Sequence, residues 1–430
     1  MQTKCVLALL AAGLAAALAG FPGPAPAVSG GGPDGYIVSP ERGWPQWRGP
    51  RRDGISREKG LLPSWPPQGP PLLWQAGGLG VGWSSPILAG GRLFITGEVG
   101  DDLVIFALDR SGKRLWQAKN GAAWKGQYPG ARASCAYAGG RLYHMNAHGR
   151  VACLEAATGR EVWAVDVLPR FGGRNITWAM SECLLVDGPR VLVTPGGSKA
   201  LMAALDARTG KTVWTTEPIP GDDATYASPI LFRHAGRRLI AGNSSRHGFG
   251  VDADTGKLLW SVPCEGRNHA TVASPVYGGG SLFYVAPYGP DGALYRLKAT
   301  RAGVAADPAW RTTLDTLCGG AVLVDGLLFG AGYSRTRHWH CLDWRTGEAR
   351  HELPDLYKGA AIYADGRLYC LGEDGTAALL RPLPDRFEVL GRFQLVNARR
   401  RDVWAHPVLL DGRLYLRYHE TLWCYDVRGR

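Results

Sequence analysis

Ten residues suited to ligand binding lie in segments that precede a recurring apolar phrase of this 430-residue sequence. Indole rings stack on flat or sugar-like molecules, and the polar and charged side chains beside them donate or accept hydrogen bonds. We expect these segments to converge at one end of the fold and to bind an anionic or sugar-like small molecule. The alternative is a water-filled space with solvated loop ends. The candidates are Trp83, Arg132, Asn175, Trp178, Glu182, Tyr226, His269, Lys358, Trp404 and His406.

Residue types for metal binding and catalysis give a weaker signal. Glu182 and Asn175 form the one pair suited to Ca²⁺ by type, with Asp222 or Asp223 as the nearest third acid. The sequence contains no C-x-x-C motif and no Cys/His set with zinc spacing. We therefore assign no catalytic residue and leave the metal unknown.

The elements that position these residues are encoded by a repeated turn. In VDADTGKLLW (Val251–Trp260), Asp252 is placed to bond backbone amides ahead of it, and Gly256 accepts a positive φ. Similar copies begin at Leu108, Leu154 and Leu205, and another at Leu342 carries His351 in the tryptophan position. The tryptophans expected to dock between units are Trp74, Trp116, Trp163, Trp214, Trp260 and, after an insertion, Trp310.

A second phrase alternates with the first: a small residue or Ser-Pro, three apolar residues, a Gly-containing turn, then Arg-Leu-Phe/Tyr. Eight copies run from SSPILAGGRLF (Ser84–Phe94) to AHPVLLDGRLY (Ala405–Tyr415), at steps of 40 to 49 residues. Such units of about four short strands indicate an all-β, eight-bladed β-propeller, with seven blades as the fallback. The last unit lacks its fourth strand, and Pro71–Ala76 is an isolated one. We expect this N-terminal strand to close the ring by pairing with the C-terminal blade.

The A-x-D-x-x-T-G-K-x-x-W repeat resembles the docking motif of pyrroloquinoline-quinone (PQQ) propellers, over roughly Pro71–Arg430. That superfamily includes quinoprotein alcohol dehydrogenases and BamB-like outer-membrane assembly propellers. For the dehydrogenases, the resemblance implies PQQ in the central channel, over a Trp and under a disulfide of adjacent Cys residues. It also implies Ca²⁺ held by Glu, Asn and Asp, and an Asp base. This sequence has no adjacent Cys pair and no haem-attachment C-x-x-C-H motif.

These departures favour an exported, non-enzymatic scaffold that binds protein or polymer partners of the cell envelope, with no cofactor. The first alternative is a PQQ-dependent alcohol or sugar dehydrogenase-like oxidoreductase, which would carry PQQ and Ca²⁺. The second is a propeller that binds a small molecule or glycan without turnover.

The N-terminal region predicts export. Residues 1–20 contain Lys4, an apolar run and the cleavage pattern Ala17-Leu18-Ala19, with cleavage as late as residue 27 as the alternative. Residues 21–43 read as a flexible Gly/Pro-rich linker and 44–70 as a lead-in segment, followed by the propeller at 71–430. Trp44 and Trp47 of the lead-in either pack on the propeller's outside or cover one end, and the alternative is a lid over the channel mouth. No Cys closely follows the apolar run, so we expect a protein of the periplasm or cell surface and not a lipoprotein.

Composition agrees with one large all-β domain. The 60 glycines and 29 prolines supply many turns, and the net charge of +12 would suit an anionic partner or merely solvated faces. No nucleic-acid motif and no further membrane-spanning stretch occurs, and we expect a monomer. Of the nine cysteines, Cys135 and Cys183 occupy the same position in neighbouring repeats, where a disulfide is conceivable although the pairing stays open.

Overall fold

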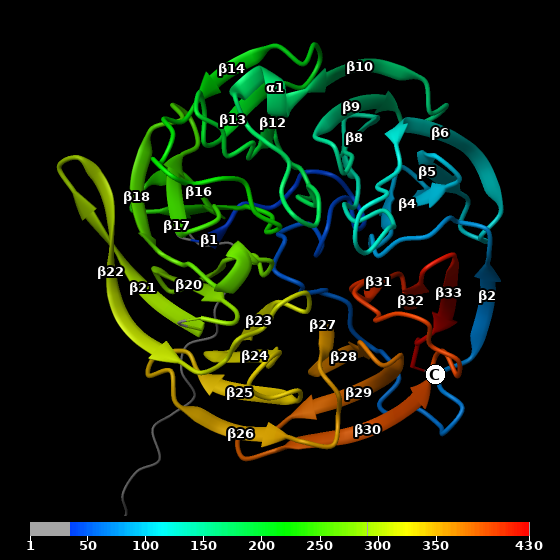
Figure 1. The fold of residues 1–430 in the computed structure, drawn as a ribbon. Coiled ribbons are helices and arrows are strands. Elements are labelled where there is room, and N and C mark those ends of the chain that lie inside the picture. Colours follow the sequence, from blue (N-terminus) through cyan, green and yellow to red (C-terminus); the bar gives the residue numbers. More distant parts are fainter. Residues whose placement is uncertain (1–34, 290, 430) are drawn as a thin grey trace, which may run out of the picture.

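The computed structural model describes residues 35–289 and 291–429 and contains eight antiparallel sheets arranged as blades around a central axis (Figure 1). The expected eight-bladed propeller is confirmed, and the fallback of seven blades is not needed. The expected signal peptide at residues 1–20 and linker positions 21–34 lie outside the described residues.

The first four blades follow one another in the chain, each built from four consecutive strands. Blade 1 contains β3 (Ile87–Ala89), β4 (Arg92–Val99), β5 (Asp102–Leu108) and β6 (Arg114–Ala122). Blade 2 contains β7 (Ala136–Ala138), β8 (Arg141–Met145), β9 (Arg150–Glu155) and β10 (Glu161–Asp166), followed by the short helix α1 (Val167–Phe171). Blade 3 contains β11 (Leu185–Asp187), β12 (Arg190–Val193), β13 (Ala203–Asp206) and β14 (Thr212–Thr215). Blade 4 contains β15 (Ile230–His234), β16 (Arg237–Asn243), β17 (His247–Asp252) and β18 (Leu258–Pro263), and β1 (Gly35–Tyr36) adds to its inner edge.

The remaining blades continue the ring. Blade 5 follows the 3₁₀ turn η1 (Arg267–His269) and contains β19 (Val276–Gly278), β20 (Ser281–Ala286), β21 (Asp291–Thr300) and β22 (Gly303–Thr312). Blade 6 contains β23 (Ala321–Val324), β24 (Leu327–Ala331), β25 (Trp339–Asp343) and β26 (Ala349–Leu353). Blade 7 contains β27 (Gly359–Ala364), β28 (Arg367–Gly372), β29 (Thr376–Pro382) and β30 (Phe387–Gln394). Blade 8 contains β31 (Val408–Leu410), β32 (Arg413–Tyr418) and β33 (Thr421–Asp426), completed by β2 (Leu72–Ala76).

The ring is closed by its N-terminal strand, as the sequence predicts. β2 pairs antiparallel with β33, and Trp74 lies opposite Cys424. One hydrophobic cluster runs from blade 7 through blade 8 into blade 1 and includes Tyr369, Leu414 and Leu93. Burial of this apolar surface ties the two ends of the propeller together.

At five of the junctions between blades, a tryptophan packs on a turn glycine of the next blade. Trp214 of β14 lies against Gly256, where an added Cβ would be 2.6 Å from the Cε3 atom of the ring. Gly256 has a φ of +78°, the conformation that its turn requires. The same contact pairs Trp74 with Gly112, Trp116 with Gly159, Trp163 with Gly210, and Trp310 with Gly347.

Indole N–H groups add hydrogen bonds to these contacts. Trp163 Nε1 donates to Ala207 O at 3.1 Å, and Trp310 Nε1 donates to Trp344 O at 3.0 Å. His351, which stands where a tryptophan is expected, places Nε2 3.0 Å from Leu383 O in the next blade. A histidine can therefore replace the docking tryptophan because it also bears a ring nitrogen that reaches the carbonyl.

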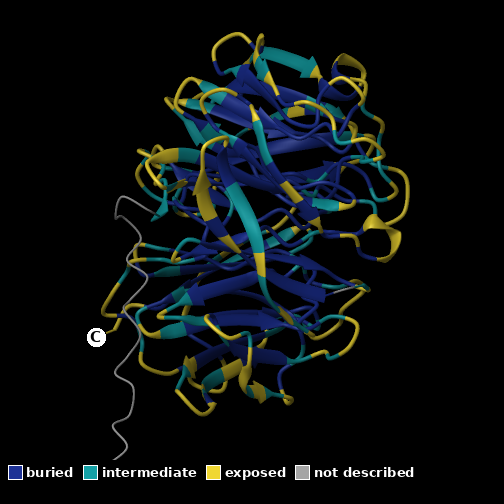
Figure 2. Ribbon diagram, turned by 90° about the vertical axis from the view of Figure 1, so that its left-hand side faces the viewer, coloured by how far each residue is buried: buried dark blue, intermediate teal, exposed yellow. Residues whose placement is uncertain are grey.

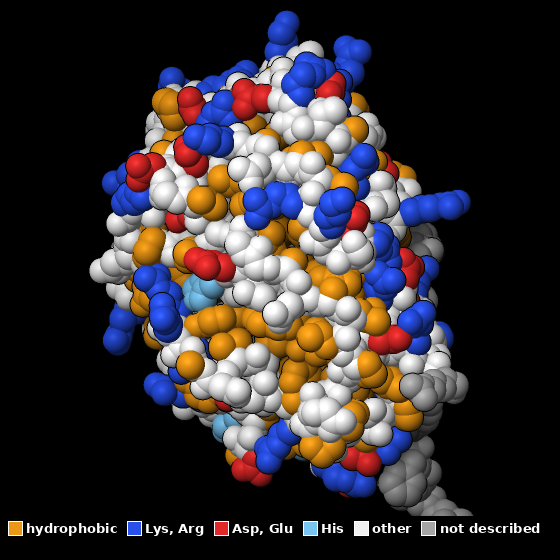
Figure 3. Space-filling model, turned by 90° about the vertical axis from the view of Figure 1, so that its right-hand side faces the viewer, with side chains coloured by type: hydrophobic (Ala, Val, Ile, Leu, Met, Phe, Trp, Pro, Cys, Tyr) orange, Lys and Arg blue, Asp and Glu red, His pale blue; other side chains and the backbone are white. Residues whose placement is uncertain are grey.

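Burial follows the geometry of the blades. Figure 2 shows buried strands through the middle of the molecule and exposed loops at its two faces. The edge that contains β2 and β6 carries a band of hydrophobic side chains between scattered Lys and Arg (Figure 3), and Leu72 and Leu115 are half exposed. None of the described helices has the length and apolar character to cross a membrane.

Candidate functional site

A segment before the first blade, residues 44–56, crosses the centre of the ring; we call it the axial strap (Figure 1). Trp44 forms a β-bridge with Leu88 of blade 1, and Ile55 forms one with Tyr363 of blade 7. The sequence repeats predict the blades, but they do not predict that residues 44–56 cross the ring. The strap closes one end of the channel and becomes the floor of the site.

Two buried arginines hold the strap in place. Arg52 donates to the carbonyl oxygens of Cys183 at 2.7 Å, Leu184 at 3.0 Å and Pro229 at 2.8 Å. Arg48 donates to Ala321 O at 2.5 Å. Burial lowers the pKa of Arg52 to about 10, which leaves the group charged at neutral pH. The strap is therefore bound to blades 3, 4 and 6 through charge-assisted hydrogen bonds.

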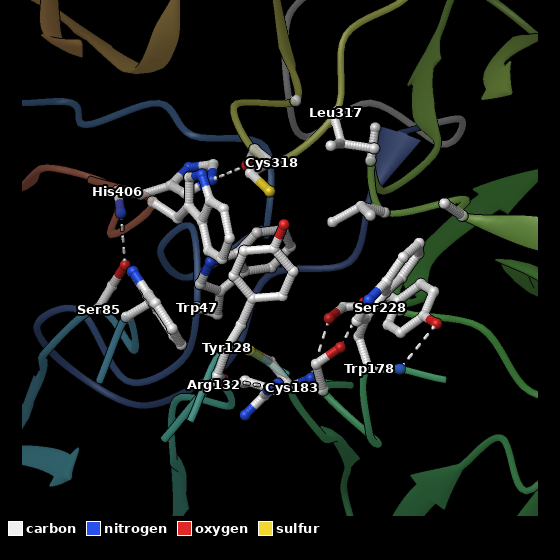
Figure 4. A pocket seen from close by; sticks show the side chains of 18 of the residues that line it. Trp47, Ser85, Tyr128, Arg132, Trp178, Cys183, Ser228, Leu317, Cys318 and His406 are labelled. Atoms are coloured by element: carbon white, nitrogen blue, oxygen red, sulfur yellow. Dashed lines mark hydrogen bonds between the residues drawn. The ribbon is translucent and has the colours of Figure 1, made fainter. Parts of the chain in front are cut away.

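Trp47 lies between these arginines and faces the channel. The Arg48 and Arg52 guanidinium carbons lie 5.6 and 6.0 Å from its ring centroid, within cation–π range. Its ring meets His406 edge to face, with centroids 5.1 Å apart. Above it the loops that precede the first strand of most blades enclose a cavity of about 210 Å³ (Figure 4).

Aromatic rings form most of the cavity wall. Trp83 and Trp404 lie with centroids 4.8 Å apart and planes tilted by 34°, and Tyr128 contacts Trp404 at 5.5 Å. Across the cavity, Trp178 packs on Tyr226 at 5.7 Å. Such a wall favours a flat ring, because each face of a ligand can stack on an indole or a phenol.

Few polar groups reach this cavity. Arg132 lines it with its guanidinium 5.8 Å from the Trp83 centroid, and it donates to Gly130 O at 2.6 Å and Tyr128 O at 2.5 Å. Burial lowers the pKa of Arg132 to about 10, so it remains cationic. Two buried nitrogens of lining residues, Trp404 Nε1 and His406 Nδ1, have no hydrogen-bond partner. A ligand with acceptor and donor groups would satisfy them.

The structure brings six of the ten sequence-predicted residues to the cavity and places the other four elsewhere. The six that line it are Trp83, Arg132, Trp178, Tyr226, Trp404 and His406. His269 is half exposed on the turn η1 and faces Glu265, with 3.3 Å between Nδ1 and Oε1. Lys358 is buried and pairs with Glu373 at 2.9 Å, and its Nζ lies 3.2 Å from the ring centroid of the lining residue Tyr333.

Glu182 and Asn175 also lie away from the cavity wall, with their polar atoms already engaged. Both Glu182 oxygens accept hydrogen bonds from Thr194, one from the backbone N–H at 2.8 Å and one from the hydroxyl at 3.2 Å. Asn175 Oδ1 accepts from the Ile176 N–H, and its Nδ2 donates to Ala147 O. Neither offers a free oxygen to a cation.

Sequence reasoning missed several lining residues. Trp47 belongs to the strap, which repeats nothing else in the chain. Tyr288 and Tyr333 come from loops between the second and third strands of blades 5 and 6, whereas the sequence-based prediction covers only loops that join blades. Tyr128 stands four residues before Arg132 in a loop already selected, and counting every aromatic of those loops would have found it.

Comparison with known proteins identifies the family to which this propeller belongs. A family profile described as "Outer membrane protein assembly factor BamB" matches residues 100–352, more than half of the chain. The chain belongs to this family of PQQ-like repeat propellers. The resemblance expected from its docking motif is thereby confirmed.

Curated relatives of this PQQ-like propeller are dehydrogenases. The quinohemoprotein alcohol dehydrogenase ADH-IIG of Pseudomonas putida is 26% identical over 34% of this chain and 22% of its own length. The dehydrogenase subunit of the quinone alcohol dehydrogenase of Komagataeibacter europaeus is 30% identical over 29% of this chain and 19% of its own. The chain thus spans about a fifth of the length of the curated relatives it matches.

Solved structures share the fold. The quinohemoprotein alcohol dehydrogenase from Comamonas testosteroni superposes with a TM-score of 0.60 at 14% identity, over 90% of this chain and 80% of that one. BamB from Moraxella catarrhalis gives 0.57 at 14% identity, over 83% of this chain and 99% of that one.

The main function expected from the sequence, a non-enzymatic scaffold, is contradicted by these relatives, and the dehydrogenase-like alternative fits them better. The error has a physical origin. The repeats encode turns and blade packing, which enzymes and scaffolds share. The absence of an adjacent Cys pair is therefore too little to exclude a dehydrogenase-like protein.

The cavity of this propeller fits a flat ring, but not the Ca²⁺ site that the dehydrogenase resemblance implies. Among the described residues that line it, none carries a carboxylate. Ca²⁺ takes oxygen ligands, mostly carboxylates and carbonyls, in sixfold or higher coordination. Cys183 and Cys318 line the wall, but the structure records both as free thiols, and the same holds for Cys135. The cavity therefore offers aromatic faces to a flat ring and, among its described lining residues, no carboxylate to a Ca²⁺ ion.

Proposed function

We propose that this propeller is an oxidoreductase-related member of the quinoprotein type whose central cavity binds a flat, quinone-like ring. The observation that carries the proposal is the aromatic box over Trp47, with Trp83 and Trp404 on one side and Trp178 and Tyr226 on the other. PQQ is such a ring, and its carboxylates would find Arg132 at the wall.

We propose binding of the ring, but no catalytic step. A general base works best with a pKa near the operating pH, and no carboxylate is available at the described wall. His406 is the one imidazole there, and burial together with the nearby Arg48 charge lowers its pKa to about 3. It would stay neutral and act as a hydrogen-bonding group for the ring rather than as a proton acceptor.

The test is calorimetric titration of the purified protein with PQQ, with and without Ca²⁺, followed in parallel by tryptophan fluorescence quenching. We expect micromolar binding that Ca²⁺ does not change, and competition by a neutral naphthoquinone. Trp404→Phe removes an indole from the box and should weaken binding about fivefold, since one stacking contact contributes roughly 1 kcal/mol.

Trp423→Phe is the matched control, because Trp423 belongs to β33 and does not line the cavity. Its affinity should equal that of the unchanged protein. Absence of binding by either quinone would refute the proposal. Binding that requires Ca²⁺ would refute the argument from the missing carboxylates. If PQQ binds, a screen of alcohols and sugars with a dye as electron acceptor tests for turnover.

We also infer that the protein is exported. The support is the apolar run of residues 6–19, which ends in the Ala17-Leu18-Ala19 cleavage pattern. Likeness to BamB further favours an envelope protein as a partner. N-terminal sequencing of protein recovered from a periplasmic fraction would identify the cleavage site, whereas an intact Met1 in the cytoplasm would contradict export.

A further inference from the structure

Two histidines and a glutamate meet on the outer strands of blade 6, apart from the central cavity. His338 directly precedes β25 and His340 lies within it, so the two alternate residues project from the same side of the strand. Trp339 between them points the other way, is 1% exposed and donates to Tyr357 O at 3.0 Å. Glu352 of β26 lies directly opposite His340 in the ladder. The strand geometry thus holds all three side chains together.

Their ligand atoms converge. His338 Nε2 lies 2.9 Å from Glu352 Oε2, and His340 Nδ1 lies 3.1 Å from Glu352 Oε1. The imidazoles are stacked with centroids 4.8 Å apart and planes 23° from parallel. One nitrogen of each histidine and a carboxylate oxygen all lie within 4.8 Å of one another. A four-coordinate Zn²⁺ with bonds of about 2.1 Å keeps its ligand atoms roughly 3.4 Å apart, which this group reaches with small side-chain movements.

A threonine orients one of the imidazoles. Thr336 Oγ1 lies 2.6 Å from His340 Nε2. When that nitrogen donates its proton to the hydroxyl, Nδ1 presents its lone pair toward Glu352. Metal-binding histidines are commonly fixed in this way by a partner at the other ring nitrogen.

We propose that His338 Nε2, His340 Nδ1 and a Glu352 carboxylate oxygen bind one Zn²⁺ per chain, with water in the fourth position. Two imidazoles and a carboxylate suit zinc, whereas Ca²⁺ prefers oxygen ligands alone. Glu352 is 45% exposed, so the fourth position opens to solvent and leaves room for an exogenous ligand. No other group of three such residues was found in the described part of the chain, and this one lies outside the cavity wall.

The experiment is titration of chelator-stripped, untagged protein with ZnCl₂ by calorimetry. We expect one equivalent to bind, and Ca²⁺ at the same concentration not to compete. Glu352→Gln and His338→Asn should reduce affinity by at least the roughly 10–100-fold that loss of a ligand's hydrogen-bond partner costs. Thr336→Val should cost about tenfold, as expected for a residue that only positions His340.

Two control variants test whether Zn²⁺ binding depends on the three-residue group or merely on a single carboxylate or a single His–Glu pair. Glu348→Gln removes an exposed carboxylate from the same hairpin, and His269→Gln breaks a His–Glu contact elsewhere, in which Glu265 also faces Arg246. Neither should change Zn²⁺ affinity or stoichiometry. Co²⁺ gives a second readout in the unchanged protein, which should show the visible bands of a four-coordinate site and lose them in Glu352→Gln.

Three outcomes would overturn the proposal. The unchanged protein might take up no Zn²⁺, the Glu352→Gln variant might bind it equally well, or Co²⁺ might show only the spectrum of the hexa-aqua ion. The Co²⁺ result does not depend on whether any variant folds. In each case the cluster would be a hydrogen-bonded His–Glu network and not a metal site.

Discussion

Glu182 shows how one buried carboxylate makes folding depend on pH. It is 1% exposed, and desolvation raises its pKa to about 7, although Thr194 and Arg52 act in the opposite direction. The unfolded chain releases this proton near pH 4.5, whereas the folded protein holds it to about pH 7. Raising the pH through this window therefore favours unfolding.

Glu182→Gln should remove that dependence, because an amide can keep both contacts with Thr194 without a charge. The variant's free energy of unfolding, relative to the unchanged protein, should rise between pH 4.5 and 7 by on the order of 3 kcal/mol. Urea unfolding at a series of pH values measures it. A flat difference for Glu182→Gln between pH 4.5 and 7 would contradict the argument.

At the scale of the element, the contact between a docking tryptophan and a turn glycine can be separated from the strain of the turn. Gly256 and Gly366 share a φ of +78°, but only Gly256 would place an added Cβ against a ring, that of Trp214. Both alanine variants incur the cost of a positive φ, about 1 kcal/mol. We expect Gly256→Ala to lose roughly 1–3 kcal/mol more, from overpacking. Equal losses in thermal or urea unfolding would show that the ring adjusts freely.

The same contact explains how much of the fold the sequence predicts. Gly256 and Trp260 recur with the same spacing in several blades because those blades make the same turn, so blade number and ring closure by Trp74 follow from the repeats. Trp47 recurs nowhere, and its position depends on Arg48 and Arg52 reaching carbonyls in distant blades. Packing across the axis carries no periodic signal, so the sequence predicts a lead-in that covers one end or forms a lid, but not that Trp47 lines the cavity.

At the scale of the whole molecule, the strap and the closing strand β2 attach the N-terminal part of the propeller to its C-terminal blades. β2 supplies the outer strand of blade 8, and the strap joins blades 1 and 7 through bridges at Trp44 and Ile55. Neighbouring blades share hydrophobic clusters, so opening the ring would expose apolar surface on both sides of the break. The candidate cavity therefore depends on the closed ring, because its lining residues run from Trp47 to His406 and come from blades all around the axis.

Buried histidines give the molecule a response to acid that opposes the effect of Glu182. Burial lowers the pKa of His144 to about 4 and that of His406 to about 3, from 6.5. Below pH 6.5 the unfolded chain takes up protons that the folded protein refuses, so acid favours unfolding by up to about 1.4 kcal/mol per pH unit for each histidine. Between pH 4.5 and 6.5 the effect of the buried histidines on stability and the effect of Glu182 have opposite signs. Comparing a single variant with the unchanged protein separates the two effects.

His144→Gln should gain stability relative to the unchanged protein as pH falls from 6.5 to 4, whatever its absolute stability. A difference between His144→Gln and the unchanged protein that stays flat over this range would contradict the assignment to a buried imidazole.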